Sequence, residues 1–286
     1  MSNRNFLLFP GFLSKAVTLS YDDGVRQDKK LIDIMLKNGL KGTFNLNSGL
    51  FEAKASSEFS GRMTKEEAVT LYKESQMEVG VHGYKHLSLA HVDIAVANNE
   101  IVIDRNELEK LFGQIIKGMA YSFGQYNEDI IDLLKKCGIN YSRTTVSTEN
   151  FSLPTNWLSL PATCHHNNPK LMELAKEFIE KEYNKYSAGS KPMLFYLWGH
   201  SYEFDRDNNW DVIESFAEFI GNRDDVWYAT NGEIYQYVKD FDALQFSIDG
   251  SMVFNPSAQT IYYNHYGKFF EIKPKTTVVL GQRGFI

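Results

Sequence analysis

Short apolar runs alternate with longer amphipathic runs along most of this chain, and this alternation limits the folds that it can adopt. The apolar runs have the length of buried strands, as in KAVTLSY (15–21). The amphipathic runs repeat apolar residues at helical spacing, as Leu31, Ile34 and Met35 do in QDKKLIDIMLKNG (27–39). Repeated strand–helix units predict parallel strands that are wrapped by helices.

The order of these units favours a barrel over an open sheet. The sequence contains no G-x-G-x-x-G and no Walker A pattern, so nothing indicates a dinucleotide site or a phosphate-binding loop. We therefore predict an α/β fold, a distorted (β/α) barrel of six to eight strands. In such barrels the chemistry takes place where the strands end and the loops begin.

The sequence changes in character from about Ala243. Helical periodicity ends there, and the alternating residues that follow are punctuated by turn pairs at Asp249-Gly250 and Tyr266-Gly267. We expect two domains, a barrel over 1–242 and a small antiparallel β-sheet extension over 243–286. No linker rich in Pro, Gly or Ser separates them, so the extension should pack on the barrel.

Composition narrows the class of protein. With 43% hydrophobic and 23% charged residues, the chain reads as a soluble globular protein, and its net charge of −6 argues against nucleic-acid binding. Cys137 and Cys164 are too few for a disulfide framework. The apolar N-terminal run is interrupted by Pro10 and Gly11, and no run is long enough to span a membrane. We therefore expect a cytoplasmic protein, of an oligomeric state that the sequence does not indicate.

Three polar groups follow predicted strands. Asp22 and Asp23 end the first strand and are either ordinary turn residues or a functional pair. His82 and His86 follow MEVGV, and two imidazoles four residues apart can bind one cation if the segment turns helically. One aspartate with these two histidines would make a His₂Asp site that leaves positions open for water. His200 follows MLFYLWG and is either a core histidine or part of the same site.

The segments TLSYDDG, HGYKH and LWGH, in this order, resemble the first, second and last motifs of the polysaccharide deacetylases of the NodB-homology type, carbohydrate esterase family 4. The resemblance covers about residues 15–240 and implies a distorted (β/α) barrel with a divalent metal, most often zinc. It also implies that Asp23, His82 and His86 bind the metal, that Asp22 is the general base and that His200 is the general acid. Cobalt, nickel or iron would suit the same ligands.

The middle motif departs from the family pattern. Where many members have Arg-Pro-Pro-Tyr-Gly, this chain has AYSFG (120–124), so Ala120 replaces the arginine that orients the base. Phe123 replaces a tyrosine whose backbone amide assists the oxyanion, a role that a backbone donor keeps, and Gly124 follows it. Arg143, on the next predicted strand, either replaces the missing arginine or is an unpaired surface residue.

The remaining site candidates are less specific. Trp157 either lines the cleft or packs in the core. His165 and His166 lie in a predicted loop, and at most one of them should face the cleft, because adjacent side chains of an extended segment diverge. Glu203, close to His200, either orients that histidine, binds sugar hydroxyls or is solvated.

Together these features predict a metal-dependent hydrolase that removes acetyl groups from N-acetylated or O-acetylated sugars. Two alternatives remain open at the level of the sequence. The same site would also hydrolyse a non-peptide C–N bond of a small-molecule amide. With Ala120 in place of the arginine, the chain could instead be a catalytically impaired, carbohydrate-binding relative.

Overall fold

The computed structural model describes residues 4–52, 61–187 and 191–281. Its centre is a parallel sheet in the order β7-β6-β5-β4-β3-β2-β9-β8, with β10 also paired to β2. This is the α/β fold predicted from the alternation of apolar and amphipathic runs. The strands are β2 (Lys15–Asp22), β3 (Gly42–Leu46), β4 (Glu78–Val81), β5 (Gly118–Ala120), β6 (Tyr141–Ser147), β7 (Leu160–Ala162), β8 (Cys164–His165), β9 (Met193–Gly199) and β10 (Trp227–Tyr228).

One short segment closes the sheet into a distorted barrel. β7 pairs with β6, and β8 pairs with β9 at the opposite end of the strand order. Only Thr163 separates β7 from β8, and its N–H donates to the carbonyl of Tyr196 on β9 over 2.8 Å. Residues 160–165 therefore pair on both sides, and all the strand ends are brought around one axis.

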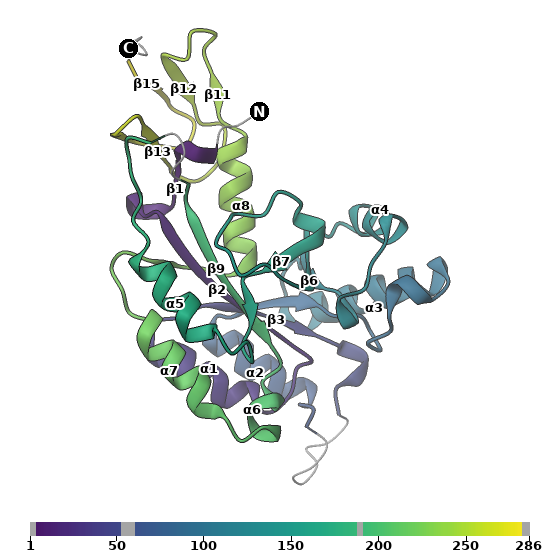
Figure 1. The fold of residues 1–286 in the computed structure, drawn as a ribbon. Helices are drawn as coiled ribbons and strands as arrows, with labels where there is room; N and C mark the ends of the chain where they lie inside the picture. The colour runs from purple at the N-terminus through teal and green to yellow at the C-terminus, as the bar shows by residue number, and fades with distance from the viewer. Residues whose placement is uncertain (1–3, 53–60, 188–190, 282–286) are drawn as a thin grey trace.

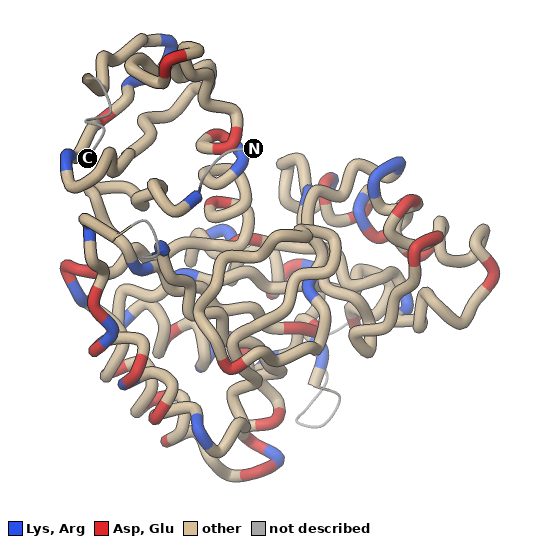
Figure 2. The backbone as a smooth tube through the Cα atoms, turned by 45° about the horizontal axis from the view of Figure 1, so that its top comes forward, with Lys and Arg blue, Asp and Glu red and all other residues tan. Residues whose placement is uncertain are grey.

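Helices cover the outside of the sheet (Figure 1). In the first helix, Leu31 and Met35 are buried and Ile34 is partly buried against the same core, as the helical spacing predicts. Ile32 is buried as well, while Lys29 and Lys30 are exposed. Acidic and basic residues are interspersed along the outer helices (Figure 2). The helices are α1 (Asp28–Lys37), α2 (Lys65–Ser75), α3 (Ile94–Phe112), α4 (Glu128–Lys136), α5 (Leu171–Glu180), α6 (Tyr202–Arg206), α7 (Trp210–Ile220) and α8 (Asn231–Asp242).

The beginning of α8 fills the amino end of the barrel. Asn231 accepts a hydrogen bond from Thr18 of β2 over 3.0 Å and donates one to Tyr196 of β9 over 2.7 Å. The N–H of Gly232 donates to Glu78, the first residue of β4, over 2.8 Å. Polar groups of α8 and of the strands therefore satisfy one another at this end of the barrel.

Two small antiparallel sheets follow α8 and lie at one end of the molecule, at the top of Figure 1. One contains β11 (Gln245–Phe246), β12 (Met252–Phe254) and β15 (Thr277–Val279), and the other contains β13 (Ile261–His265), β14 (Lys268–Ile272) and the N-terminal β1 (Leu7–Leu8).

The predicted antiparallel appendage is thus present, and its turns lie where the sequence places them. Gly250 has a φ of 71°, and Tyr266 and Gly267 have φ values of 49° and 88°. Residues 282–286 of the predicted extension lie outside the described residues. Among the described residues, no helix combines the length and the apolar character that a membrane crossing requires.

Candidate metal and catalytic site

The three motifs meet at the carboxyl end of the barrel. β2 ends at Asp22, β4 ends one residue before His82 and β9 ends one residue before His200. Because the strands are parallel, their carboxyl ends lie on the same side of the sheet. The distances between the side chains show that all three groups share one small volume.

A tight turn brings both adjacent aspartates to this volume. Side chains alternate along a strand, so two neighbours in a straight strand would point apart. Asp23 instead has a φ of 85° and Gly24 a φ of 63°, and the N–H of Asp23 donates to the carbonyl of Asn45 over 3.0 Å. The chain therefore bends immediately after Asp22, and both carboxylates lie within 4 Å of His82 Nε2.

His82 and His86 converge through a turn that is not helical. Gly83 and His86 have φ values of 85° and 59°, outside the right-handed helical region. Two carboxylates of α3 hold this turn by its backbone. Asp104 accepts the N–H of His82 over 3.1 Å, and Glu100 accepts the N–H of Lys85 over 2.8 Å.

Asp23, His82 and His86 form a group that fits a metal ion. His86 Nε2 lies 3.2 Å from His82 Nε2 and 3.7 Å from Asp23 Oδ1, and all the donor atoms lie within 4.8 Å of one another. His82 Nδ1 lies 2.8 Å from the carbonyl oxygen of Ala120. A carbonyl only accepts, so Nδ1 carries the hydrogen and the lone pair of Nε2 faces the other two ligands.

The charge state of His86 also suits a ligand. Burial, with the neighbouring His82, lowers its pKa to about 4, although Asp23 and Asp22 act in the opposite direction. The imidazole is therefore neutral at neutral pH, which is the form that binds metals. These residues are the donor set that zinc and similar divalent metals use.

Asp22 has a different environment from Asp23. It is buried, and Arg143 Nη2 contacts its Oδ2 while Asn45 Nδ2 donates to Oδ1 over 2.9 Å. Burial by itself favours the neutral acid, but Arg143, His82 and His200 outweigh it and lower the pKa of Asp22 well below its usual range. Asp22 is consequently an ionised carboxylate that two donors hold in place.

Arg143 reaches Asp22 of β2 from β6, a strand that does not pair with β2. It is fully buried, so the alternative of an unpaired surface residue is wrong. In the pairing of β5 with β6 its partner is Ala120, the position at which the resembling family has arginine. Its guanidinium also lies over the ring of Trp198, 4.4 Å from the ring centroid. The guanidinium is thus supplied one strand away from its usual position.

His200 lies between Asp22 and Glu203. Its Nε2 is 4.0 Å from Asp22 Oδ2, and its Nδ1 is 3.6 Å from Glu203 Oε1. Burial alone would lower the pKa of His200, but Glu203, Asp22 and Asp23 outweigh it and raise that pKa. This environment favours the protonated imidazolium, which is the form that a general acid requires.

His165 and His166 both contact Glu203. Their Nε2 atoms lie 3.1 Å and 3.0 Å from its Oε2, because β8 ends at His165 and strand alternation does not continue to His166. His166 is fully buried between Tyr21 and Phe204, whereas His165 is partly exposed. The imidazoles lower the pKa of Glu203 against the effect of its burial, so Glu203 is ionised.

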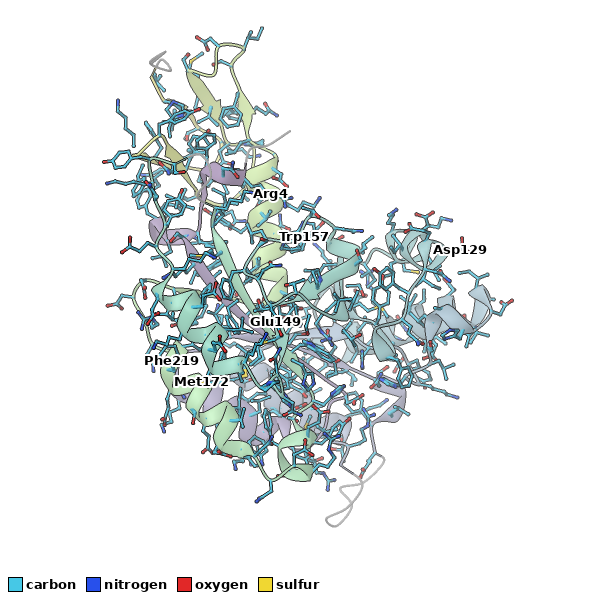
Figure 3. The ribbon with its side chains drawn as sticks, in the orientation of Figure 1. Arg4, Asp129, Glu149, Trp157, Met172 and Phe219 are labelled. Atoms are coloured by element: carbon cyan, nitrogen blue, oxygen red, sulfur yellow. The ribbon has the colours of Figure 1, made fainter. Side chains whose placement is uncertain are left out.

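The other candidates from the sequence lie in two places. The centroid of the exposed Phe123 ring lies 4.6 Å from that of the His86 ring, beside the candidate metal ligands. Gly124 has a φ of 69°, and a Cβ there would lie 2.3 Å from Thr145 Oγ1, so this turn itself requires glycine. Trp157 precedes β7, and its ring packs on that of Tyr235 of α8, with the ring centroids 5.1 Å apart. Figure 3 shows Trp157 beside α8, which fills the amino end of the barrel, so Trp157 lies away from this site.

Five residues of the site were not predicted from the sequence, namely Asn45, Asn47, Arg62, Glu100 and Asp104. The sequence could have indicated Asn45 and Asn47, because they are polar residues two apart at the end of the otherwise buried segment KGTFNLN. The sequence contains no feature that we recognise as indicating Arg62, Glu100 or Asp104. All three lie outside the motifs, and only the tertiary structure brings them to the site.

Known proteins resemble this chain in sequence and in fold. Residues 12–142 match the family model described as polysaccharide deacetylase. A structure of a putative polysaccharide deacetylase from Mycobacterium smegmatis is 14% identical with a TM-score of 0.57, covering 82% of this chain and 93% of that one. The chain therefore shares the fold of that protein. Over residues 12–142 its sequence is similar to the polysaccharide deacetylases, the family that the motifs resemble.

Two further solved structures are similar over part of their length. A Streptococcus pyogenes deacetylase in complex with acetate is 22% identical with a TM-score of 0.45, covering 50% of this chain and 61% of that one. A family 4 carbohydrate esterase from Streptomyces lividans in complex with acetate is 15% identical with a TM-score of 0.48, covering 73% of this chain and 86% of that one. The chain thus spans about three fifths of the S. pyogenes protein. No curated protein matches the chain.

Proposed function

We propose that this protein is a metal-dependent deacetylase of acetylated sugars, with N-acetyl groups as its principal substrate. One observation carries the proposal. The metal-binding group, an ionised carboxylate and a histidine with a raised pKa lie within hydrogen-bonding or near-contact distance of one another at the carboxyl end of the barrel. Hydrolysis of an amide needs an electrophile, a base and an acid, and these residues supply a candidate for each.

Asp23, His82 and His86 would hold the cation, and zinc is the first choice. A divalent cation at this position supplies Lewis acidity, which polarises the acetyl carbonyl and makes water more acidic. The donor set accepts other divalent metals of similar preference, so the metal that is bound in the cell also depends on availability.

Asp22 would act as the general base. Its contact with Arg143 and its hydrogen bond from Asn45 keep it ionised and fix its orientation. It takes a proton from the attacking water as the new C–O bond forms. Arg143 is a positioning residue in this scheme, because it acts through Asp22.

His200 would act as the general acid. As the C–N bond breaks, its imidazolium gives a proton to the departing amine, and the acyl group leaves as acetate. Glu203 holds the opposite nitrogen of the ring at 3.6 Å and favours the protonated form. Backbone donors near Phe123 would face the oxyanion, and the exposed ring of Phe123 offers an apolar surface to the substrate.

The experiment measures hydrolysis by the zinc-loaded protein, as acetate release from acetylated sugars and as ring opening of cyclic amides. The panel of substrates contains N-acetylglucosamine oligomers, acetylxylan and small cyclic amides, and the matched control is Asp22→Asn. Release from N-acetylglucosamine oligomers that is lost in the variant supports the proposal. Hydrolysis of cyclic amides alone would move the function to small-molecule C–N bonds. A zinc-loaded wild type that releases nothing would indicate a binding protein.

A further inference from the structure

The two adjacent aspartates are each paired with an arginine that lies outside the three motifs. Asp22 is paired with Arg143, and Asp23 is paired with Arg62. Arg62 Nη2 lies 3.3 Å from Asp23 Oδ1, and its Nη1 donates to the backbone carbonyl of the same residue. One guanidinium therefore holds both the carboxylate and the main chain of the predicted metal ligand.

Arg62 also connects the first motif to the second. Its Nη1 donates to Asn47 Oδ1 over 3.1 Å. The amide of Asn47, which is buried, donates to the carbonyls of His82 and Gly83 over 2.8 Å and 2.7 Å. A continuous chain of hydrogen bonds thus runs from Asp23 through Arg62 and Asn47 to the backbone of His82.

The segment that carries Arg62 is itself fixed. The N–H of Arg26 donates to the carbonyl of Gly61 over 2.8 Å, and the N–H of Met63 donates to the carbonyl of Gly24 over 3.3 Å. These bonds attach the backbone on both sides of Arg62 to the turn that follows Asp23. The side chain of Arg62 is about three quarters buried, so its position is set by the fold and not by chance surface contact.

We propose that Arg62 is a positioning residue of the metal centre, an inference that rests on the proposed function. It has two effects of opposite sign on cation binding. By holding Asp23 in register with His82, it favours binding, as outer-sphere partners of metal ligands do. By placing its own positive charge beside Asp23, Arg62 lowers the affinity of the site for the metal cation.

Two substitutions separate these effects. Arg62→Lys keeps the positive charge but loses the planar guanidinium, which contacts Asp23 and Asn47 together. Its affinity for Zn²⁺ should therefore be about 10- to 100-fold below that of the wild type. Arg62→Met loses both the guanidinium contacts and the positive charge, so it should bind Zn²⁺ about tenfold more tightly than Arg62→Lys does. The control is Arg105→Lys, because Arg105 contacts Glu109 and the Cys137 carbonyl on the outer side of α3.

Zn²⁺ affinity is measured on the purified full chain by competition with a chromogenic chelator. A second readout is the visible absorption of the Co²⁺-saturated protein, which reports the arrangement of the ligands. Arg62→Lys should change that spectrum, and Arg105→Lys should leave it as in the wild type. Far-UV circular dichroism of each metal-free variant shows whether it is folded.

The outcomes separate the two proposals. A wild type that binds no Zn²⁺ or Co²⁺ overturns the metal centre and, with it, the role of Arg62. A wild type that binds them, with unchanged affinity and spectrum in Arg62→Lys, overturns only the role of Arg62. Arg62→Met binding no more tightly than Arg62→Lys overturns the charge effect. If Arg62→Lys does not fold, Asn47→Asp tests the same chain of hydrogen bonds, and an unchanged Co²⁺ spectrum in that variant overturns the proposal.

Discussion

The carboxyl end of the barrel contains two clusters that each combine two histidines with one carboxylate, Asp23 with His82 and His86, and Glu203 with His165 and His166. They are alike in residue type, yet their hydrogen bonds differ. His82 Nδ1 faces a carbonyl oxygen, which requires a hydrogen on Nδ1 and leaves Nε2 free to bind a metal. His165 Nδ1 accepts the N–H of Asn167 over 3.1 Å.

This second arrangement has the opposite consequence. An imidazole that accepts at Nδ1 carries its hydrogen on Nε2, and in His165 that atom faces Glu203. Its Nε2 lone pair is therefore not available to a cation. We infer that the first cluster is suited to a metal and the second to holding Glu203 as an anion beside His200. A single backbone group makes this difference, so residue composition alone does not define a metal site.

The largest expected effect comes from the carboxylate beside the first cluster. Asp22→Asn removes the proposed base and should reduce the turnover of an acetylated substrate by about 10²- to 10⁴-fold. Its affinity for Zn²⁺ should change little, because Asp22 is not one of the proposed ligands. Steady-state kinetics and a chelator competition measure the two quantities. Turnover close to that of the wild type would remove Asp22 from the mechanism.

A second prediction concerns the guanidinium of Arg143, which balances the charge of Asp22. Arg143→Met leaves the buried Asp22 without its cation and should reduce the free energy of unfolding by about 3–5 kcal/mol. In an Asp22→Asn background the same substitution should cost much less, since there is no charge to balance. Urea unfolding of the four proteins of this cycle tests the pair. Equal costs in both backgrounds would mean that the two residues do not interact.

The third prediction compares the clusters directly. His82→Ala should weaken Zn²⁺ binding by more than the roughly 100-fold that the loss of an outer partner causes. His165→Ala should leave the affinity and the stoichiometry of one Zn²⁺ per chain unchanged. Isothermal titration with Zn²⁺ and elemental analysis measure both. A loss of bound metal in His165→Ala would show that the second cluster also binds a cation.

The smallest effect is a change in pH dependence. Glu203 helps to raise the pKa of His200, so Glu203→Gln should lower that pKa. The proposed acid is active while it is protonated, so activity falls as pH rises through its pKa. The alkaline limb of the kcat profile should therefore move to lower pH in Glu203→Gln, with kcat reduced more at pH 8 than at pH 6. An unchanged alkaline limb would assign it to another group.

The sequence was sufficient to predict the strand–helix order, the antiparallel extension and the residues that end β2 and β9. These features depend on local periodicity and on the rule that parallel strands end together. For Arg143 the sequence left two alternatives, a replacement for the missing arginine or an unpaired surface residue, and its contact with Asp22 excludes the second. Its role in catalysis remains a prediction.

Other features depend on contacts between distant segments. The turn that brings His86 back to His82 is held by α3, and Arg62 reaches Asp23 through backbone pairing of a separate segment. From the sequence, Trp157 could either line the cleft or pack in the core, and only its packing on α8 decides between these alternatives. In each case the local sequence permits several conformations, and the tertiary structure selects one.

The pairing of β1 with β13 has a consequence for how the chain folds during synthesis. Leu7 and Leu8 leave the ribosome long before their partners Tyr263 and Tyr262, which lie far along the chain. The edge of β1 that pairs with β13 must therefore stay uncovered until β13 has been made. A fragment that stops at residue 242 would leave this edge uncovered permanently. We expect such a fragment to aggregate, even though the candidate metal site and the barrel strands lie entirely within it.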